Sequence, residues 1–267
     1  MKKNVIAGAL AAGAMLIAGS AMAADMPVKA PYLKAPPMAY SWTGCYLDAG
    51  AGYGMWNQDH STTTNFFTPP VPNITTITTT DGGRGWLGRF GAGCDYQVSS
   101  SWVIGAFGDY DWTNIKGSMS PLLVGGGFPI VADEKESSEW SVGGRIGYLI
   151  TPTVLTFLDA GYTQARFDQM NLMSNLGVVG SAAFPAHTYH GWFIGSGFEY
   201  AFTWLPINGL FVRSEYRYST FQKDDLTAFN VVTGLPAGNT GLGDVLHSST
   251  YVQTVTTSLV YRFNMGH

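Results

Sequence analysis

Residues 191–218 hold two stretches in which apolar and polar side chains alternate, GWFIGSGFEY and LFVRSEYRY, separated by the connector AFTWLPING. A period of two predicts β-strands, and two such strands around a short connector predict a hairpin. One face of the hairpin is apolar and aromatic, and the other carries four charges: Glu199, Arg213, Glu215 and Arg217. A smooth apolar face backed by a charged one predicts lipid on one side of the sheet and a polar lumen on the other.

The same alternation occurs in eight segments: 43–56, 84–97, 102–112, 139–148, 154–164, 191–200, 210–218 and 251–263. The intervening connectors alternate between more than 20 residues (57–83, 113–138, 166–188, 219–249) and short turns (98–101, 149–153, 201–209). Long loops at one end and tight turns at the other are typical of outer-membrane barrels, in which the long loops are extracellular. We therefore expect an all-β protein, an eight-stranded antiparallel up-and-down transmembrane β-barrel.

Aromatic residues bracket the segments at both ends. Trp86 and Tyr96 lie 10 residues apart, as do Trp102 and Trp112. At about 3.3 Å per residue and a tilt near 40°, this spacing covers roughly 25 Å, the height of the apolar band of a barrel. The predicted outer girdle is Trp56, Trp86, Trp112, Trp140, Tyr162, Trp192 and Tyr218, and the inner one is Trp42, Tyr96, Trp102, Tyr148, Tyr200, Trp204 and Phe263.

The start of the chain predicts export. A basic start, an apolar core and the motif Ala21-Met22-Ala23 indicate a signal peptide over 1–23, too short in its apolar part to span a membrane as a helix. We expect a Pro-rich periplasmic linker over 24–41, the barrel over 42–263 and a short tail over 264–267. Removing Lys2 and Lys3 from the 14 basic residues leaves 12 against 18 acidic ones, a net charge of −6 that argues against nucleic acid as a partner.

Several segments resemble the RopB-type family of small outer-membrane barrels. They are WTGCYLDAGAGYG (42–54), WVIGAFGDYDWTNIKG (102–117), GGRIGY (143–148), GWFIGSGFEYAFT (191–203), RSEYRY (213–218), the terminal YRF (261–263) and ADMPVKAP after the signal peptide. The resemblance implies an eight-stranded, OmpA-like barrel in a Gram-negative outer membrane. Relatives include major surface proteins, proteins labelled as porins and a few haem-binding members. The chain departs from the family pattern at Cys45, where an aromatic residue is usual, and in its tail after Phe263.

Twelve charged residues are predicted to face the lumen: Asp48, Arg89, Asp95, Asp109, Asp111, Arg145, Asp159, Glu199, Arg213, Glu215, Arg217 and Arg262. An eight-stranded barrel is only wide enough for side chains to fill its interior. Arg–carboxylate pairs would satisfy many donors there, so we favour a salt-bridged plug. The alternative is a narrow, weakly cation-preferring pore.

Two further groups of residues are candidate sites. Cys45 and Cys94 fall on neighbouring predicted strands and would either form a disulfide or remain two thiols facing lipid. Four histidines in the predicted extracellular loops could hold haem or a metal, or be ordinary polar loop residues: His60, His187, His190 and His247. No G-x-S-x-G motif frames a serine, so we expect no enzymatic activity, no catalytic residue and no cofactor.

The expected role is therefore structural: envelope integrity and surface recognition through four long loops. The expected partners are outer-membrane lipid and lipopolysaccharide, and the barrel assembly machinery during biogenesis. The sequence does not identify an extracellular ligand.

Overall fold

A computed structural model of the protein describes residues 41–64, 74–75, 78–124, 128–174, 179–205, 207, 209–237 and 244–263. The chain divides into two units, and all of these residues belong to the second, Ala39–His267. The expected signal peptide, nearly all of the expected linker and the tail over 264–267 lie outside the described residues. No helix in the described part of the chain is long and apolar enough to cross a membrane.

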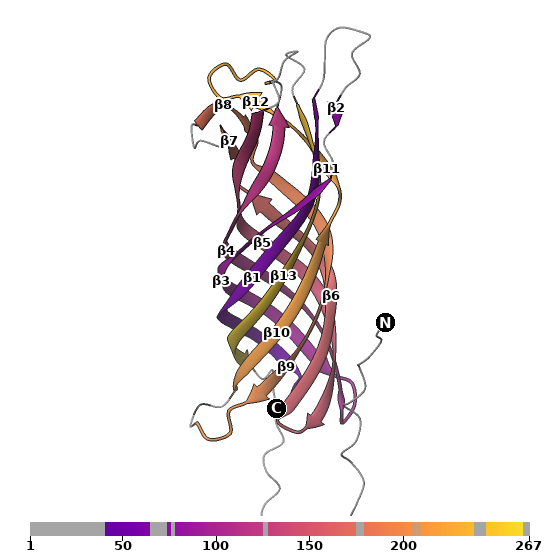
Figure 1. Ribbon diagram of the computed structural model, residues 1–267. Coiled ribbons are helices and arrows are strands. Elements are labelled where there is room, and N and C mark those ends of the chain that lie inside the picture. Colours follow the sequence, from indigo (N-terminus) through magenta and orange to yellow (C-terminus); the bar gives the residue numbers. More distant parts are fainter. Residues whose placement is uncertain are drawn as a thin grey trace, which may run out of the picture. The chain divides into compact units, whose positions relative to one another are not determined.

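The described residues form one antiparallel β-sheet (Figure 1). Its long strands are β1 (Gly44–Thr64), β3 (Thr79–Gln97), β4 (Trp102–Val124), β5 (Phe128–Thr151), β6 (Val154–Phe167), β9 (His187–Ala201), β10 (Leu210–Phe221) and β13 (Val245–Phe263). Its short strands are β2 (Ile74–Thr75), β7 (Met170–Ser174), β8 (Val179–Phe184), β11 (Asp224–Thr227) and β12 (Phe229–Asn230).

The eight long strands close into a ring. Each pairs with the next along the chain, and the last strand returns to the first. The β1–β13 register runs without interruption from Cys45 opposite Phe263 to Thr63 opposite Val245. Because the ring is closed, none of these strands has an unpaired edge. A closed sheet can form all of its backbone hydrogen bonds without water.

Side chains alternate between the two faces of the ring. On β13 every second residue from Leu246 to Arg262 is buried, whereas Val255, Leu259, Tyr261 and Phe263 are exposed on the outer face. On β4, Trp102, Ile104, Tyr110 and Trp112 are likewise exposed. The wall of the ring is therefore apolar on the outside, as the period-two pattern predicts.

The strands are longer than the sequence analysis predicted. β4 continues to Val124 and β5 begins at Phe128, so the expected connector 113–138 is mostly strand, and β1 likewise continues to Thr64. The prediction relied on contrast between an apolar and a polar face. Beyond the apolar band the outer face is polar, and only the buried inner positions, such as Ile115 and Met119, still alternate. We call this lengthened end the extended end, and the opposite end the short-turn end.

Two tryptophans predicted to lie in the aromatic girdles are inside the ring. Trp42 is 1% exposed and Trp56 is 0% exposed, whereas Trp86 on the outer wall is 71% exposed. Both have the same sequence parity as Tyr46 and Asp48, which point inward from β1. Their assignment to the girdles was wrong, and the parity of β1 was the signal that could have corrected it.

Apolar side chains fill the ring at three levels. The cluster at the short-turn end contains Trp42, Tyr46, Val103, Leu149, Leu155, Ala201, Phe211 and Val260. A second cluster contains Trp56, Ile115, Ala165, Phe167, Tyr189, Phe221 and Val252. A third, in the extended end, contains Met119, Ala132, Met170, Leu172, Phe184, Leu226, Ala228, Ala237 and Leu246. The twelve charged residues predicted to face the lumen lie beside the first cluster and between it and the second.

Candidate functional site: the charged interior of the ring

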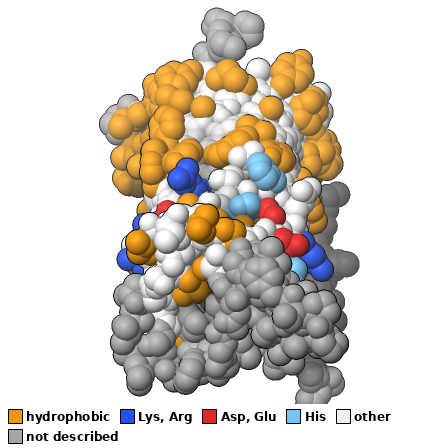
Figure 2. Space-filling model, turned by 90° about the horizontal axis from the view of Figure 1, so that it is seen from above, with side chains coloured by type: hydrophobic (Ala, Val, Ile, Leu, Met, Phe, Trp, Pro, Cys, Tyr) orange, Lys and Arg blue, Asp and Glu red, His pale blue; other side chains and the backbone are white. Residues whose placement is uncertain are grey.

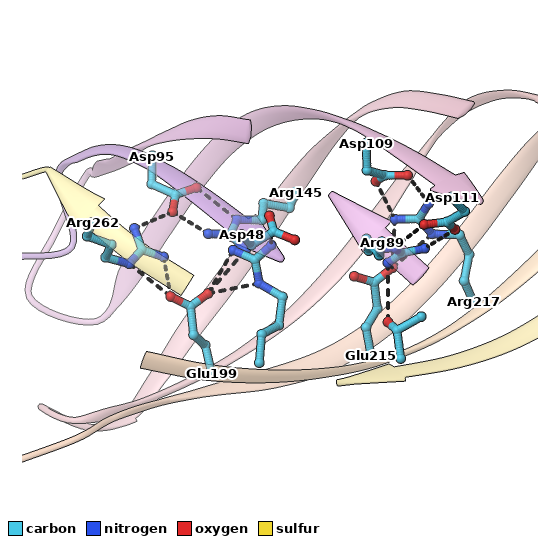
Figure 3. Close-up of polar contacts among 12 residues, drawn as sticks. Asp48, Arg89, Asp95, Asp109, Asp111, Arg145, Glu199, Glu215, Arg217 and Arg262 are labelled. Carbon is cyan, nitrogen blue, oxygen red and sulfur yellow. Dashed lines mark hydrogen bonds and ion pairs between the residues drawn. The ribbon is translucent and has the colours of Figure 1, made fainter. Parts of the chain in front are cut away.

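The twelve residues predicted to face a lumen all point into the ring, and each of the eight long strands supplies at least one of them. Alternation within each strand places them there: Asp109 and Asp111 on β4 are two residues apart, as are Glu215 and Arg217 on β10. Figure 3 shows that the charges separate into two groups along the ring. One group lies next to the apolar cluster of the short-turn end, and the other lies further along.

The first group is centred on Glu199 of β9. Arg262 donates from Nε and Nη2 to Glu199 Oε1, at 2.9 and 2.6 Å. Arg213 donates from Nε and Nη2 to Glu199 Oε2, at 3.1 and 3.0 Å, and Arg145 Nη1 lies 3.4 Å from the same oxygen. The remaining donors reach two further acids: Arg262 and Arg145 contact Asp95, and Arg213 contacts Asp48. Three arginines and three carboxylates thus balance in charge.

The second group is built on two fork-shaped ion pairs. Arg89 donates from Nε and Nη2 to the two oxygens of Asp111, both at 2.8 Å. Arg217 donates from Nη1 and Nη2 to the two oxygens of Asp109, both at 2.9 Å. Glu215 joins the pairs, at 2.8 Å from Arg217 Nε and 3.3 Å from Arg89 Nη1. This geometry matches planar guanidinium to planar carboxylate, which makes such bonds strong and directional.

Asp159 lies beside a small hollow between the groups, and in the described part of the chain it forms no ion pair with an arginine. Its Oδ1 is buried without a hydrogen-bond partner among the described residues. The hollow has a volume of about 10 Å³ and is also bordered by Asp48, Arg89 and Arg145. A single water needs roughly 10–15 Å³ measured in this way, so the space holds one water at most. A β-carbon at Gly195 would overlap Asp159, which explains the glycine facing it from β9.

Aromatic rings cover the faces of the guanidinium groups. Tyr46 has Arg213 at 4.5 Å, Arg145 at 4.7 Å and Arg262 at 5.1 Å from its ring centroid. Phe193 has Arg217 at 4.2 Å. Ring faces attract cations, and the rings also separate the charges from the apolar clusters. This role of Tyr46 was not predicted from the sequence.

Three buried glutamates of β5 were missed by the sequence analysis. Glu139 accepts hydrogen bonds from Thr163 at 2.6 Å and Ser219 at 2.9 Å. Glu136 is 0% exposed, and neither of its oxygens has a hydrogen-bond partner among the described residues. Glu134 is buried too, and Gln58, with its amide nitrogen turned toward it, donates a bond of 3.1 Å. Glu139 has the inward parity of Arg145, which was the available signal.

Burial sets the protonation of the two glutamates in the extended end. It raises the pKa of Glu134 to about 8, and the negative charge of Asp81 adds to the effect. Burial also raises the pKa of Glu136 well above its usual value, reinforced by Glu139 and Asp111. A carboxyl that cannot be hydrated retains its proton to higher pH, so Glu134 favours the neutral form near neutral pH and the pKa of Glu136 is shifted in the same direction.

Cys45 and Cys94 lie directly opposite each other on β1 and β3. They are joined by a disulfide with an S–S distance of 2.04 Å, and the two positions are 49 residues apart in the chain. Of the two arrangements left open by the sequence, the structure therefore has the bridged one. The disulfide ties the first two strands together at the short-turn end.

The four histidines were predicted to lie in loops, and this prediction was wrong. They lie on strands β1, β9 and β13. Their partners differ: His187 pairs with Asp224 and His247 with Asp225, both at 2.6 Å, His190 contacts the Tyr162 hydroxyl at 2.7 Å, and His60 contacts Thr79 at 3.1 Å. The described residues contain no group of three His, Cys, Asp or Glu side chains placed to hold a metal ion. Burial lowers the pKa of His60 against the opposing effect of Asp81.

A closed antiparallel sheet with an apolar outer wall and a polar interior is the architecture of proteins that cross the outer membrane. Residues 9–263 match the family described as outer membrane protein beta-barrel domain, and the chain belongs to this family. The protein is accordingly an outer-membrane protein.

Two curated relatives support the same placement. Both are called 31 kDa outer-membrane immunogenic protein, from Brucella melitensis biotype 1 and Brucella suis biovar 1. Each is 28% identical over 269 residues, covering 98% of this chain and 100% of the relative. Among solved structures, OprG of Pseudomonas aeruginosa is similar with a TM-score of 0.47 and 10% identity, over 83% of this chain and 97% of OprG. The outer-membrane protein AlkL has a TM-score of 0.40 and 12% identity, over 87% of this chain and 97% of AlkL.

Proposed function

We propose that this protein is an eight-stranded transmembrane barrel with a closed interior, and that it is a structural, non-catalytic component of the outer membrane. The motif resemblance noted above supports membership of the RopB-type barrels as part of this proposal. The short-turn end would face the periplasm, because both ends of the ring, residues 42 and 263, are there. The extended end would then face the outside.

The observation that carries the proposal is the filling of the interior. Between the two charged groups the hollow is only about 10 Å³, too little for a hydrated ion. At the short-turn end, Trp42, Tyr46 and Phe211 are buried across the ring, and in the opposite direction Trp56, Phe167 and Tyr189 pack against one another. An ion would have to displace apolar clusters and break several charge-assisted bonds to pass. Both steps are costly.

The proposed role of the extended end is contact with the surroundings of the cell. Strand β4 continues 12 residues beyond Trp112, to Val124, and β5 begins 12 residues before Trp140, at Phe128. Paired backbone therefore extends beyond the predicted apolar band. The buried cluster around Met119, Phe184 and Leu246 supports these extensions. The Brucella relatives are named as immunogenic outer-membrane proteins. We extend surface exposure, though not their immunogenicity, to this protein.

Planar-bilayer conductance tests the closed interior. The purified, folded protein is expected to give no single-channel steps under conditions in which a reference porin conducts. A Trp42→Ala, Phe211→Ala variant, which removes two large side chains from the cluster at the short-turn end, is the matched test of whether that cluster contributes to closure. Reproducible steps from the wild-type protein would refute the plug and favour the narrow passive pore.

A further inference from the structure

Positive charges of the described residues that do not face the interior gather on the outer wall of the extended end. They are Arg84, Lys116, Lys135, Arg166 and Lys223. Three of them form one lateral row across strands β3, β4 and β5, because Arg84 is opposite Lys116 and Lys116 is opposite Lys135. We call Arg84, Lys116 and Lys135 the basic row. Directly opposed residues of an antiparallel pair have β-carbons about 4.5–5.5 Å apart.

Like charges placed directly opposite each other destabilise a sheet. In the basic row only Lys135 forms an ion pair, with Asp168 at 3.5 Å, and both side chains of that pair are well exposed. Among the described residues, neither Arg84 nor Lys116 has an ion-pair partner. The stretches after residue 64 that the structure does not describe contain no Asp or Glu that could supply one. The row therefore has an excess of positive charge.

The row has a defined level relative to the apolar band. Arg84 is two residues beyond Trp86 toward the extended end, and Lys116 is four residues beyond Trp112. At about 3.3 Å per residue and a tilt near 40°, these offsets are roughly 5–10 Å, the depth of the headgroup layer next to the hydrocarbon. Trp86 and Trp112 are among the most exposed side chains of the wall, at 71% and 60%. Cations thus lie directly above exposed aromatic rings. Figure 2 shows the charged side chains of this end in a zone beside hydrophobic ones.

A hollow adjoins the row on the same wall. It lies between β4, β5 and β7 and has a volume of about 710 Å³. Its lining combines the cations Lys116 and Lys135 with hydrogen-bonding groups of Ser118, Gln169 and Asn171. It also contains the acidic residues Asp133, Glu134 and Asp168. Ammonium groups suit phosphate, whereas amides and carboxylates suit sugar hydroxyls. A purely anionic headgroup would meet these three acidic residues, so the mixed lining favours a sugar that carries phosphate.

We propose that the basic row and the adjoining hollow bind the headgroup of a phosphorylated glycolipid in the outer leaflet, with its phosphate on Arg84, Lys116 and Lys135 and its acyl chains against Trp86 and Trp112. This assignment rests on the proposed orientation, in which the extended end faces outward. It gives the membrane a residue-specific contact with the wall of the barrel. The opposite wall, where Lys223 lies near Asp225 and His247, lacks such a row.

The test measures binding of a fluorescent diphosphorylated glucosamine-disaccharide glycolipid to the full chain in phosphatidylcholine nanodiscs. The dephosphorylated glycolipid and inorganic phosphate serve as separate probes. Lys116→Gln is expected to weaken binding about fivefold, the effect of about 1 kcal/mol per Lys or Arg at an anionic lipid surface. The triple variant Arg84→Gln, Lys116→Gln, Lys135→Gln is expected to weaken it at least tenfold. Lys223→Gln removes another exposed lysine, on the opposite wall, and is the matched control.

Three outcomes would overturn the assignment: equal binding of the dephosphorylated glycolipid, displacement by inorganic phosphate at matched ionic strength, or an equal loss in Lys223→Gln and Lys116→Gln. Circular dichroism and the unfolding midpoint verify folding, and the single variants remain informative if the triple variant does not fold. Conductance is measured on the same samples. If the protein conducts ions but still binds the glycolipid through the basic row, only the closed interior is refuted. If the protein does not conduct and its binding does not depend on the basic row, only this site is refuted.

Discussion

Arg262 of β13 donates two hydrogen bonds to a single oxygen of Glu199 on β9, at 2.9 and 2.6 Å. The two strands are not neighbours, because β10 lies between them. The other oxygen of Glu199 accepts from Arg213 of that intervening strand. One carboxylate therefore ties three consecutive strands together on the inside of the ring, next to the seam where β13 meets β1.

Replacing Glu199 with Gln should strongly destabilise the protein. The change leaves Arg145, Arg213 and Arg262 buried with one carboxylate fewer, and breaking a buried ion pair from one side costs about 3–5 kcal/mol. Urea unfolding in detergent measures the effect. Asp225→Asn removes an exposed carboxylate from a surface pair and should cost about 0–1 kcal/mol. Equal stability of the two variants would contradict the central role of Glu199.

Two substitutions of Tyr46 can distinguish the contribution of its ring to stability from that of its hydroxyl group. Its ring contacts the guanidinium groups of Arg145, Arg213 and Arg262, whereas its hydroxyl oxygen has no hydrogen-bond partner among the described residues. Tyr46→Phe should therefore leave the unfolding free energy within about 1 kcal/mol of the wild type. Tyr46→Ala should lose about 3–5 kcal/mol, since it removes the ring contacts and leaves a cavity. A Phe variant as unstable as the Ala variant would show that the hydroxyl, and not the ring, matters.

The disulfide between Cys45 and Cys94 should stabilise the protein through the unfolded chain. A closed segment of 49 residues corresponds to about 4 kcal/mol in the chain-entropy treatment. Reduced wild-type protein and the Cys45→Ala, Cys94→Ala variant should both unfold at lower denaturant concentration than the oxidised protein, and at concentrations similar to each other. Thiol titration of the denatured, unreduced protein should find no free thiol. Two free thiols per chain would refute the bridge.

Alternation along single strands accounts for what the sequence could reveal of this fold. The parity of Arg213, Glu215 and Arg217 on one strand is a local property, and it indicates which side chains share a face without any knowledge of neighbouring strands. Alternation cannot identify the buried face of a strand where the side chains of both faces are polar. In the stretch Asp133, Glu134, Lys135, Glu136 every residue is charged, so neither the strand nor the burial of its two glutamates was predicted.

The choice of partner within the charged interior could not be predicted. Arg217 pairs with Asp109, which is 108 residues away in the chain, and Arg262 pairs with Asp95, 167 residues away. Such pairs depend on the register between every intervening pair of strands, and a shift of one residue would turn each side chain to the other face. Asp159 illustrates the limit: it faces the interior as predicted, and arginines border the same small hollow, but its Oδ1 has no hydrogen-bond partner among the described residues.

The buried glutamates of the extended end predict how stability depends on pH. The pKa of Glu134 is raised to about 8, and that of Glu136 is also raised, both chiefly by burial. Because the folded-state pKa exceeds the unfolded one, the stabilising contribution is complete below the unfolded value. It is lost as pH rises toward the folded value. Between about pH 4.5 and pH 8 the free energy of unfolding should therefore fall, by up to about 4 kcal/mol for a single such group.

Unfolding midpoints across this pH range measure the slope. Glu134→Gln and Glu136→Gln should each flatten it, because the neutral amide has no proton to lose as the pH rises. Asp133→Asn is the matched control, since Asp133 adjoins Glu134 in the chain but is exposed on the outer face, and its removal should leave the slope unchanged. A slope in the two glutamine variants as steep as that of the wild type would show that these carboxyls are already ionised in the folded protein. In that case water or a cation reaches the interior of the extended end, and the apolar cluster around Met119, Phe184 and Leu246 does not exclude it.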